Sequence, residues 1–188
     1  MRSTRPPQFR MQIHDQRGER LYLDEAERQR FLAVVQQQAP ELQTLCLVLF
    51  YTGCRLSEAL ALTSDSPRLT EGVICFRTLK RRGLFMREVP VPAWLIRQLL
   101  DTAPTGRLWA IHRATAWRRI KQIMATADIS GAQATPKGLR HGFGVHAVRC
   151  GIPLNLLQKW LGHSQMTTTA IYANATGTTE RRLAEVMW

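Results

Sequence analysis

The spacing of hydrophobic residues changes twice along the chain and predicts helices, then strands, then helices again. Residues 23–38 begin with Asp24 and Glu27 at the spacing of a capping box and continue with apolar positions at helical spacing. Residues 41–53 are apolar almost all round, which predicts a buried helix that ends at Gly53. Residues 54–63 return to helical spacing.

The middle of the chain alternates between apolar and polar residues, which is the period of a strand. GVICFRT at 72–78 and FMREVPV at 85–91 are rich in β-branched and aromatic residues. They predict a hairpin whose tip, LKRRGL at 79–84, is basic. Pro92 then suits the first turn of another helix.

The second half of the chain predicts further helices. In residues 115–129 the spacing places Trp117, Ile120 and Met124 in the core and the basic side chains outside. The last third predicts four short helices, at 137–151, 153–163, 164–174 and 178–188. The fold class is therefore mainly α with a small antiparallel β-sheet (α+β).

Length and composition indicate one domain. The 188 residues are 45% hydrophobic, enough for a core, and residues 21–188 form the predicted domain behind a flexible basic arm at 1–20. No apolar run is long enough to span a membrane, and the N-terminus lacks the apolar core of a secretory signal. The four cysteines lack metal-site spacing, which favours buried thiols in a reducing cytosol. We expect no metal and no cofactor.

The net charge of +12 is the strongest signal in the composition. Such an excess of lysine and arginine favours a polyanionic partner. An anionic membrane is disfavoured because no basic amphipathic helix with a wide aromatic face is present. Nucleic acid is the expected partner.

Two basic pairs are candidates for holding a phosphate. Arg55 follows Gly53, and Glu58 is placed to hold its guanidinium, while Lys137 and Arg140 share one face of a helical turn. Arginine forks suit phosphodiester oxygens. Each residue alone is more typical of a solvated or ion-paired surface group.

His163 and Tyr172, nine positions apart, have ordinary interpretations too. Each alone is typical of packing: a capping histidine and a half-buried aromatic. The order of all these residues is more informative. Arg55 in TGCRLSE, the hairpin lysine Lys80, KxxR at 137–140, LGH at 161–163 and Tyr172 together resemble the tyrosine recombinase (phage-integrase-like) family over about residues 20–188.

The resemblance implies a tyrosine recombinase catalytic-domain fold and a mechanism without metal or ATP. It implies that Arg55, Arg140 and His163 hold the scissile phosphate and that Tyr172 attacks it, leaving a 3′-phosphotyrosine and a free 5′-hydroxyl. Lys80 becomes the general acid. Many members have histidine at the position of Lys137, whereas the related type IB topoisomerases have lysine there.

The family also implies contacts to DNA and between subunits. Arg81 and Arg82 compete with Lys80 as phosphate contacts, and Arg118, Arg119 and Lys121 are candidate DNA contacts; a solvated basic surface remains the alternative for all of them. The partners implied are double-stranded DNA with specific recombination sites, possible accessory DNA-bending proteins, and other copies in a tetramer on DNA joined through the tail at 178–188.

Other interpretations stay open. A type IB topoisomerase would use the same residues alone, a DNA-binding regulator would not cleave, and a fragment would need a missing N-terminal domain. The chain is similar in size to the short invertases that switch fimbrial promoters. The expected location is the cytoplasm, at the nucleoid of a bacterial cell.

Overall fold

The computed structural model describes residues 12–80, 83–102 and 105–173, and the elements follow the predicted order of helices, strands and helices. The first helices are α1 (Glu25–Val35), α2 (Pro40–Thr52) and α3 (Leu56–Ala59). The strands are β1 (Pro67–Arg68), β2 (Val73–Lys80) and β3 (Gly83–Pro90). The later helices are α4 (Ala93–Thr102), α5 (Arg113–Thr126), α6 (Pro136–Arg149), α7 (Leu154–Leu161) and α8 (Met166–Ala170).

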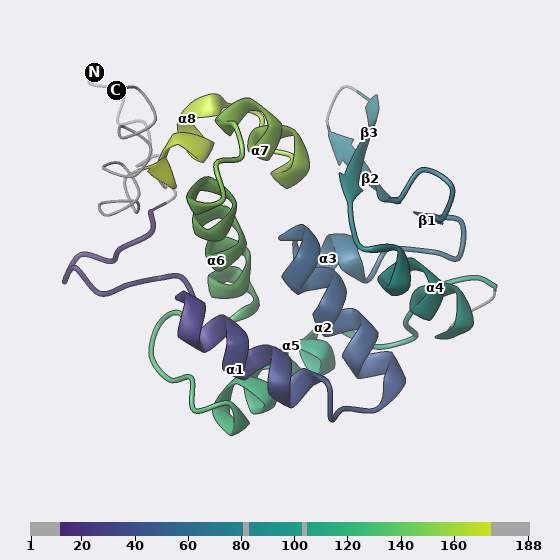
Figure 1. The fold of residues 1–188 in the computed structure, drawn as a ribbon, viewed down its shortest axis with the longest axis horizontal. Coiled ribbons are helices and arrows are strands. Elements are labelled where there is room, and N and C mark those ends of the chain that lie inside the picture. The colour runs from purple at the N-terminus through teal and green to yellow at the C-terminus, as the bar shows by residue number, and fades with distance from the viewer. Residues whose placement is uncertain (1–11, 81–82, 103–104, 174–188) are drawn as a thin grey trace, which may run out of the picture.

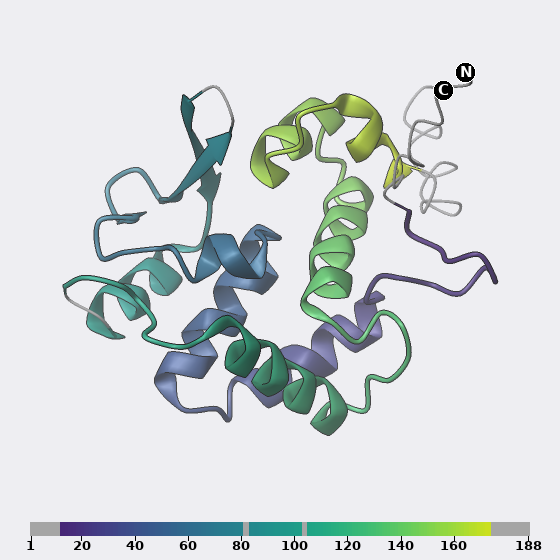
Figure 2. The same cartoon turned by 180° about the vertical axis from the view of Figure 1, so that it is seen from behind.

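Helix α2 is the centre of the main core. It packs against α1, α4 and α6, while the sheet with α4 lies on one side of the molecule and α6, α7 and α8 on the other (Figure 1). From behind, α5 crosses in front of α1 (Figure 2), and these two helices are in contact. Leu45 and Leu49 of α2 are 1% exposed, which fits its predicted burial on nearly all sides.

Local signals at the helix ends are confirmed. The Asp24 side chain accepts a hydrogen bond from the backbone N–H of Glu27, and the Glu27 side chain accepts one from the backbone N–H of Asp24. Helix α2 ends at Gly53 with φ of 59°, where a residue without Cβ is favoured. A Cβ there would also meet the ring of Phe143 at 2.4 Å. Gly53 therefore turns the chain at the end of α2, two residues before Arg55.

The sheet is antiparallel in the order β1-β2-β3, and its two long strands pair from Val73 with Pro90 to Lys80 with Gly83. The strands extend further toward the tip than predicted, and β1 is a short addition that the sequence pattern did not indicate. Arg81 and Arg82 lie outside the described residues.

Two expectations about the helices were wrong. Trp117 is 43% exposed, whereas Ile120 and Met124 of the same helix are buried as predicted. The helical spacing in 54–63 yields only the four residues of α3. Within the predicted arm, Ile13 is 5% exposed and its carbonyl accepts the N–H of Leu21, whereas most of residues 14–20 are exposed. Residues 1–11 and the last predicted helix, 178–188, lie outside the described residues.

Within the described residues, no helix is both long and apolar enough to cross a membrane.

Candidate active site

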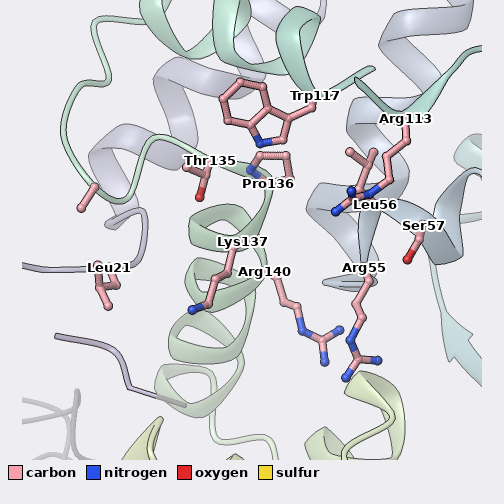
Figure 3. Close-up of a pocket in the computed structure, with 11 residues that line it drawn as sticks. Leu21, Arg55, Leu56, Ser57, Arg113, Trp117, Thr135, Pro136, Lys137 and Arg140 are labelled. Carbon is pink, nitrogen blue, oxygen red and sulfur yellow. The ribbon is translucent and has the colours of Figure 1, made fainter. Parts of the chain in front are cut away.

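A cationic pocket of about 540 Å³ opens where the start of α3 meets the starts of α5 and α6 (Figure 3). Two of its walls carry the basic residues that the sequence singled out: Arg55 before α3, and Lys137 and Arg140 on α6. The remaining lining residues are Leu21, Leu56, Ser57, Arg113, Trp117, Ala132, Thr135 and Pro136. The guanidinium groups of Arg55 and Arg140 face each other in Figure 3.

Arg55 is held by Glu58, as the spacing predicted. Its Nη1 donates to Glu58 Oε1 at 2.9 Å, and its backbone N–H donates to Glu58 Oε2 at 2.8 Å. The same carboxylate receives Arg87 of β3, whose Nη2 lies 2.8 Å from Oε2. Burial would raise the pKa of Glu58, but Arg87 and Arg55 outweigh it and hold this pKa below its usual value. Glu58 is therefore a charged, shared support for two arginines.

Arg140 is buried at 3% exposure and connects distant parts of the chain. Its Nη1 donates to the carbonyl of Gly53 at 2.7 Å and its Nη2 to the carbonyl of Leu161 at 2.8 Å. Burial, followed by the charge of Arg55, lowers the pKa of Arg140 to about 10, so the group is still a cation at neutral pH. Its Nε is buried and has no hydrogen-bond partner.

Lys137 lies one turn earlier on α6 and is exposed. Thr135 caps this helix by accepting the backbone N–H of Gly138 at 3.0 Å. Gly138 is required here, because a Cβ would come within 1.8 Å of the carbonyl oxygen of Gln133. The tight entry into α6 thus places Lys137 and Arg140 on the pocket.

His163 follows Gly162, whose left-handed φ of 66° ends α7. Its Nδ1 lies 2.9 Å from the hydroxyl of Thr169, and its Nε2 is buried without a hydrogen-bond partner. Burial, with the nearby charges of Arg140 and Arg55, lowers the pKa of His163 to about 3. The imidazole is therefore neutral at physiological pH.

Tyr172 is fully buried rather than half-buried. Its hydroxyl lies 3.1 Å from Nδ1 of His141, and its ring stacks on His163 with centroids 6.3 Å apart. A Cβ on Gly144 would meet the ring at 2.6 Å, so this glycine makes room for the tyrosine. Burial raises the pKa of Tyr172 to about 12, although Arg140 and Arg55 act against it. The phenol is protonated at rest.

The predicted residues therefore fall into two adjoining groups. Arg55, Lys137 and Arg140 share the pocket, whereas His163 and Tyr172 belong to the packed cluster behind it, with Leu157 and Leu161. Lys80 is the last residue of β2, paired with Gly83. On α5, Arg118 and Arg119 are exposed and Lys121 is half-buried.

Several residues of the site escaped the sequence analysis: Arg87, Arg113, Trp117, His141 and Thr169. Trp117 stands one helical turn from Arg113 and lines the pocket with it, which explains its exposure. His141 directly follows Arg140, and Thr169 lies in the TTT of residues 167–169. None of these residues carries a local signal that separates it from ordinary packing.

The arrangement suits an anion with several oxygens. Nε of Arg140 and Nε2 of His163 are both buried without a hydrogen-bond partner. The guanidinium groups of Arg55 and Arg140 face each other (Figure 3). Such groups stabilise negative charge without reorganising. Among the described residues, no three side chains of His, Cys, Asp or Glu are grouped so as to hold a metal ion.

The amino-acid sequence is similar to those of known recombinases. A profile of the phage integrase family matches residues 21–178. Tyrosine recombinase XerD of Vibrio cholerae is 32% identical over 172 residues, which cover 81% of this chain and 56% of the relative. The chain spans about half the length of the curated relatives it matches.

Two solved structures share the fold. The crystal structure of XerA recombinase superposes with a TM-score of 0.75 at 26% identity, covering 88% of this chain and 64% of that one. The catalytic domain of bacteriophage HP1 integrase gives a TM-score of 0.68 at 28% identity, covering 83% of this chain and 88% of that domain.

Proposed function

This chain belongs to the phage integrase family, and from that premise we propose that it is a site-specific DNA recombinase acting through a covalent 3′-phosphotyrosine. One observation carries the proposal: a phenol lies next to buried nitrogen groups that could bind an anion. Tyr172 lies against His163, and His163 and Arg140 each keep one buried nitrogen without a partner. A phosphodiester would supply the missing acceptors.

The pocket side binds the scissile phosphate in this mechanism. Arg55 and Arg140 contact its non-bridging oxygens, and Lys137 adds a third cation from α6. As the phenol attacks, negative charge grows on those oxygens, and the fixed cations stabilise it without a metal. Glu58 keeps Arg55 in place but is itself turned toward Arg87 and Arg55, so it does not repel the phosphate.

The covalent step exchanges one phosphate ester for another. The phenolic oxygen of Tyr172 bonds to phosphorus, the bond to the 5′-oxygen breaks, and Lys80 gives that oxygen a proton. The aryl ester keeps enough energy for a second 5′-hydroxyl to reverse the step, so rejoining needs no ATP. Before attack, Tyr172 leaves its buried contact with His141, and the arginines lower the cost of ionising the phenol.

The wider activity follows the same proposal. Double-stranded DNA with specific sites is the substrate, contacted in addition by Arg113, Arg118 and Arg119 of α5 and by Arg81 and Arg82 at the hairpin tip. Four copies act together on two sites, joined through the tail at 178–188, with accessory DNA-bending proteins where the site requires them. Action on chromosomal DNA implies the cytoplasm, at the nucleoid of a bacterial host.

The test is covalent trapping. The wild-type chain and Tyr172→Phe are incubated with a nicked suicide substrate carrying the DNA that flanks its gene. We expect a protein–DNA adduct that survives denaturation for the wild type and none for Tyr172→Phe, with DNA affinity unchanged. An adduct formed by Tyr172→Phe would assign the nucleophile elsewhere. Relaxation of supercoils by a single copy, without exchange between two sites, would indicate the topoisomerase instead.

Lys80 has a separate test through the leaving group. Lys80→Ala should slow cleavage by about 10² to 10⁴-fold, the usual range for a lost general acid. A 5′-bridging phosphorothiolate, whose thiol leaves without a proton, should restore the rate for Lys80→Ala. Lys137→Ala is the matched lysine control and should not be rescued. Rescue of Lys137→Ala alone would exchange the roles of the two lysines.

A further inference from the structure

A second cluster of reactive groups lies at the far end of α6, away from the pocket at its start. Cys150 caps this helix, and its sulfur lies 3.5 Å from Nε2 of His146. Nδ1 of the same imidazole lies 2.9 Å from Oε2 of Glu25 at the start of α1. A thiol, an imidazole and a carboxylate therefore stand in line, which is the order of an activated cysteine.

Cys150 differs from the other cysteines in access. It is exposed, whereas Cys46, Cys54 and Cys75 are buried at 0%, 1% and 4% exposure. Burial raises the pKa of Cys46 to about 12 and that of Cys54 to about 11, and it also raises the pKa of Cys75. The chain has four cysteines in all, so a reagent for accessible thiols has one natural target.

The charges around Cys150 are mainly positive. Arg28 of α1 is 4% exposed, lies 4.1 Å above the ring of Phe50, and has two guanidinium nitrogens without hydrogen-bond partners. Burial lowers its pKa to about 10, and the charge of Glu25, whose Oε2 lies 3.8 Å from Nε of Arg28, is the largest cause that acts in the other direction. The exposed Arg149 directly precedes Cys150.

Glu25 fixes the orientation of the imidazole. Its Oε2 lies 2.9 Å from Nδ1 of His146, so Nε2 of the same ring meets the sulfur of Cys150 at 3.5 Å. The partial negative charge at the end of α6 favours cationic groups there, and Arg149 stands in this last turn. Nε2 of His146 is therefore placed to accept the thiol proton.

We propose that Cys150 is a nucleophilic thiol and a site of modification by small disulfides, with His146 as its base and Glu25 as the residue that positions His146. The thiol proton moves to Nε2 of His146. The thiolate sulfur attacks one sulfur of a low-molecular-weight disulfide, a new S–S bond forms, the old one breaks, and the second half leaves as a thiolate. The protein sulfur is oxidised and the departing sulfur is reduced, so no other reactant is needed.

The surroundings also select the kind of disulfide. Arg28 pairs with Glu25, the carboxylate that also holds His146, and the exposed Arg149 precedes Cys150 in the chain, so we expect an anionic disulfide to be attracted and a cationic one repelled. The modified side chain would replace the contact of Cys150 with His146, at the junction of α1 and α6. The Cys150 site is separate from the pocket. A negative result for Cys150 would therefore not bear on the proposed function.

The test is the rate of thiol modification in the native full-length chain. 5,5′-Dithiobis(2-nitrobenzoate), an anionic disulfide, releases a coloured thiolate that is followed by absorbance, and cystamine serves as the cationic counterpart. We expect one fast-reacting thiol per chain, absent in Cys150→Ser, and a clear preference for the anionic reagent. His146→Gln should slow this phase about tenfold and Glu25→Gln less, with a changed pH profile in both.

Controls separate chemistry from unfolding. His14→Gln removes an exposed histidine elsewhere and should leave the fast phase unchanged. Circular dichroism melting must show the same folded fraction for all variants. A fast phase that persists in Cys150→Ser, a rate no faster than that of free cysteine, or an unchanged rate and pH profile in His146→Gln would each overturn the proposal.

Discussion

Two groups of polar side chains lie next to α6, and they differ in exposure and in charge. We call them the pocket flank and the buried flank. On the pocket flank, Arg55, Lys137 and Arg140 line an open cavity, and the buried Arg140 is still a cation at neutral pH. On the buried flank, His141, His163 and Tyr172 are packed away from solvent and neutral, with pKa values of about 3, 3 and 12. Burial is the largest cause of all three shifts.

This difference suggests a division of labour. Cations that must meet a phosphate gain from being fixed before it arrives, because no reorganisation is then required. A phenol that forms a covalent bond is better kept protonated and covered until DNA is bound. Arg140 belongs to both flanks, since it lines the pocket and donates to the carbonyl of Leu161 beside the buried cluster.

Acid should distinguish the flanks most strongly. The folded pKa values of His141 and His163, about 3, lie below the ordinary value of 6.5. Their contribution to stability is complete above pH 6.5 and is lost as the pH falls toward 3, because the unfolded chain binds protons first. We expect the free energy of unfolding to fall by several kcal/mol between about pH 7 and pH 4.

Urea denaturation at a series of pH values measures this loss. His163→Asn should make the free energy of unfolding depend less steeply on pH. His14→Gln, at an exposed histidine, is the control and should leave this dependence unchanged. Equal slopes for wild type and His163→Asn would mean that the buried flank does not titrate as described.

Glu58→Gln tests the support of the pocket flank. Arg87 is 7% exposed and would lose its counter-charge, which for a buried ion pair costs about 3 kcal/mol or more. Arg55 would lose its anchor at the same time, so cleavage should weaken as well. The measurements are chemical denaturation and single-turnover cleavage.

The matched control for Glu58→Gln is Glu88→Gln. Glu88 pairs with Arg68 at 3.5 Å, and both side chains are about half exposed. Removing this charge should change stability by about 0.5 kcal/mol or less. Comparable losses for the two variants would show that Glu58 is an ordinary surface acid.

Gly144→Ala should have a smaller effect than Glu58→Gln and tests the packing of the buried flank. Alanine inside a helix usually stabilises by about 0.5 to 1 kcal/mol relative to glycine. Here the added methyl meets the ring of Tyr172, and overpacking costs about 1 to 3 kcal/mol. In a Tyr172→Ala background the same change should become stabilising, so thermal melts of the four proteins would show a reversal of sign. No reversal would place the clash elsewhere.

The sequence was sufficient where the signal is local. Asp24 with Glu27, the end of α2 at Gly53 and the pairing of Arg55 with Glu58 all depend on neighbours a few residues apart. The hairpin and the fold class also follow from the period of the hydrophobic residues. The roles of the six candidate catalytic residues came from the order of motifs and stay a prediction.

The rest depends on contacts between distant segments. Arg87 meets Glu58 across 29 residues and His141 meets Tyr172 across 31, and no local pattern marks either pair. Trp117 shows a further limit, because hydrophobic spacing does not separate an aromatic in the core from one in a pocket wall. The exposed ring follows from its position one turn after Arg113.

The bond between His163 and Thr169 has a consequence for timing. It closes a short loop, and Tyr172 comes only three residues after Thr169, with its backbone N–H donating to the carbonyl of Thr169 at 3.1 Å. A displacement of the tyrosine therefore pulls on the histidine, or else breaks this bond first. In the proposed mechanism, His163 and Tyr172 should therefore move together when DNA binds, and both movements should show the same rate constant.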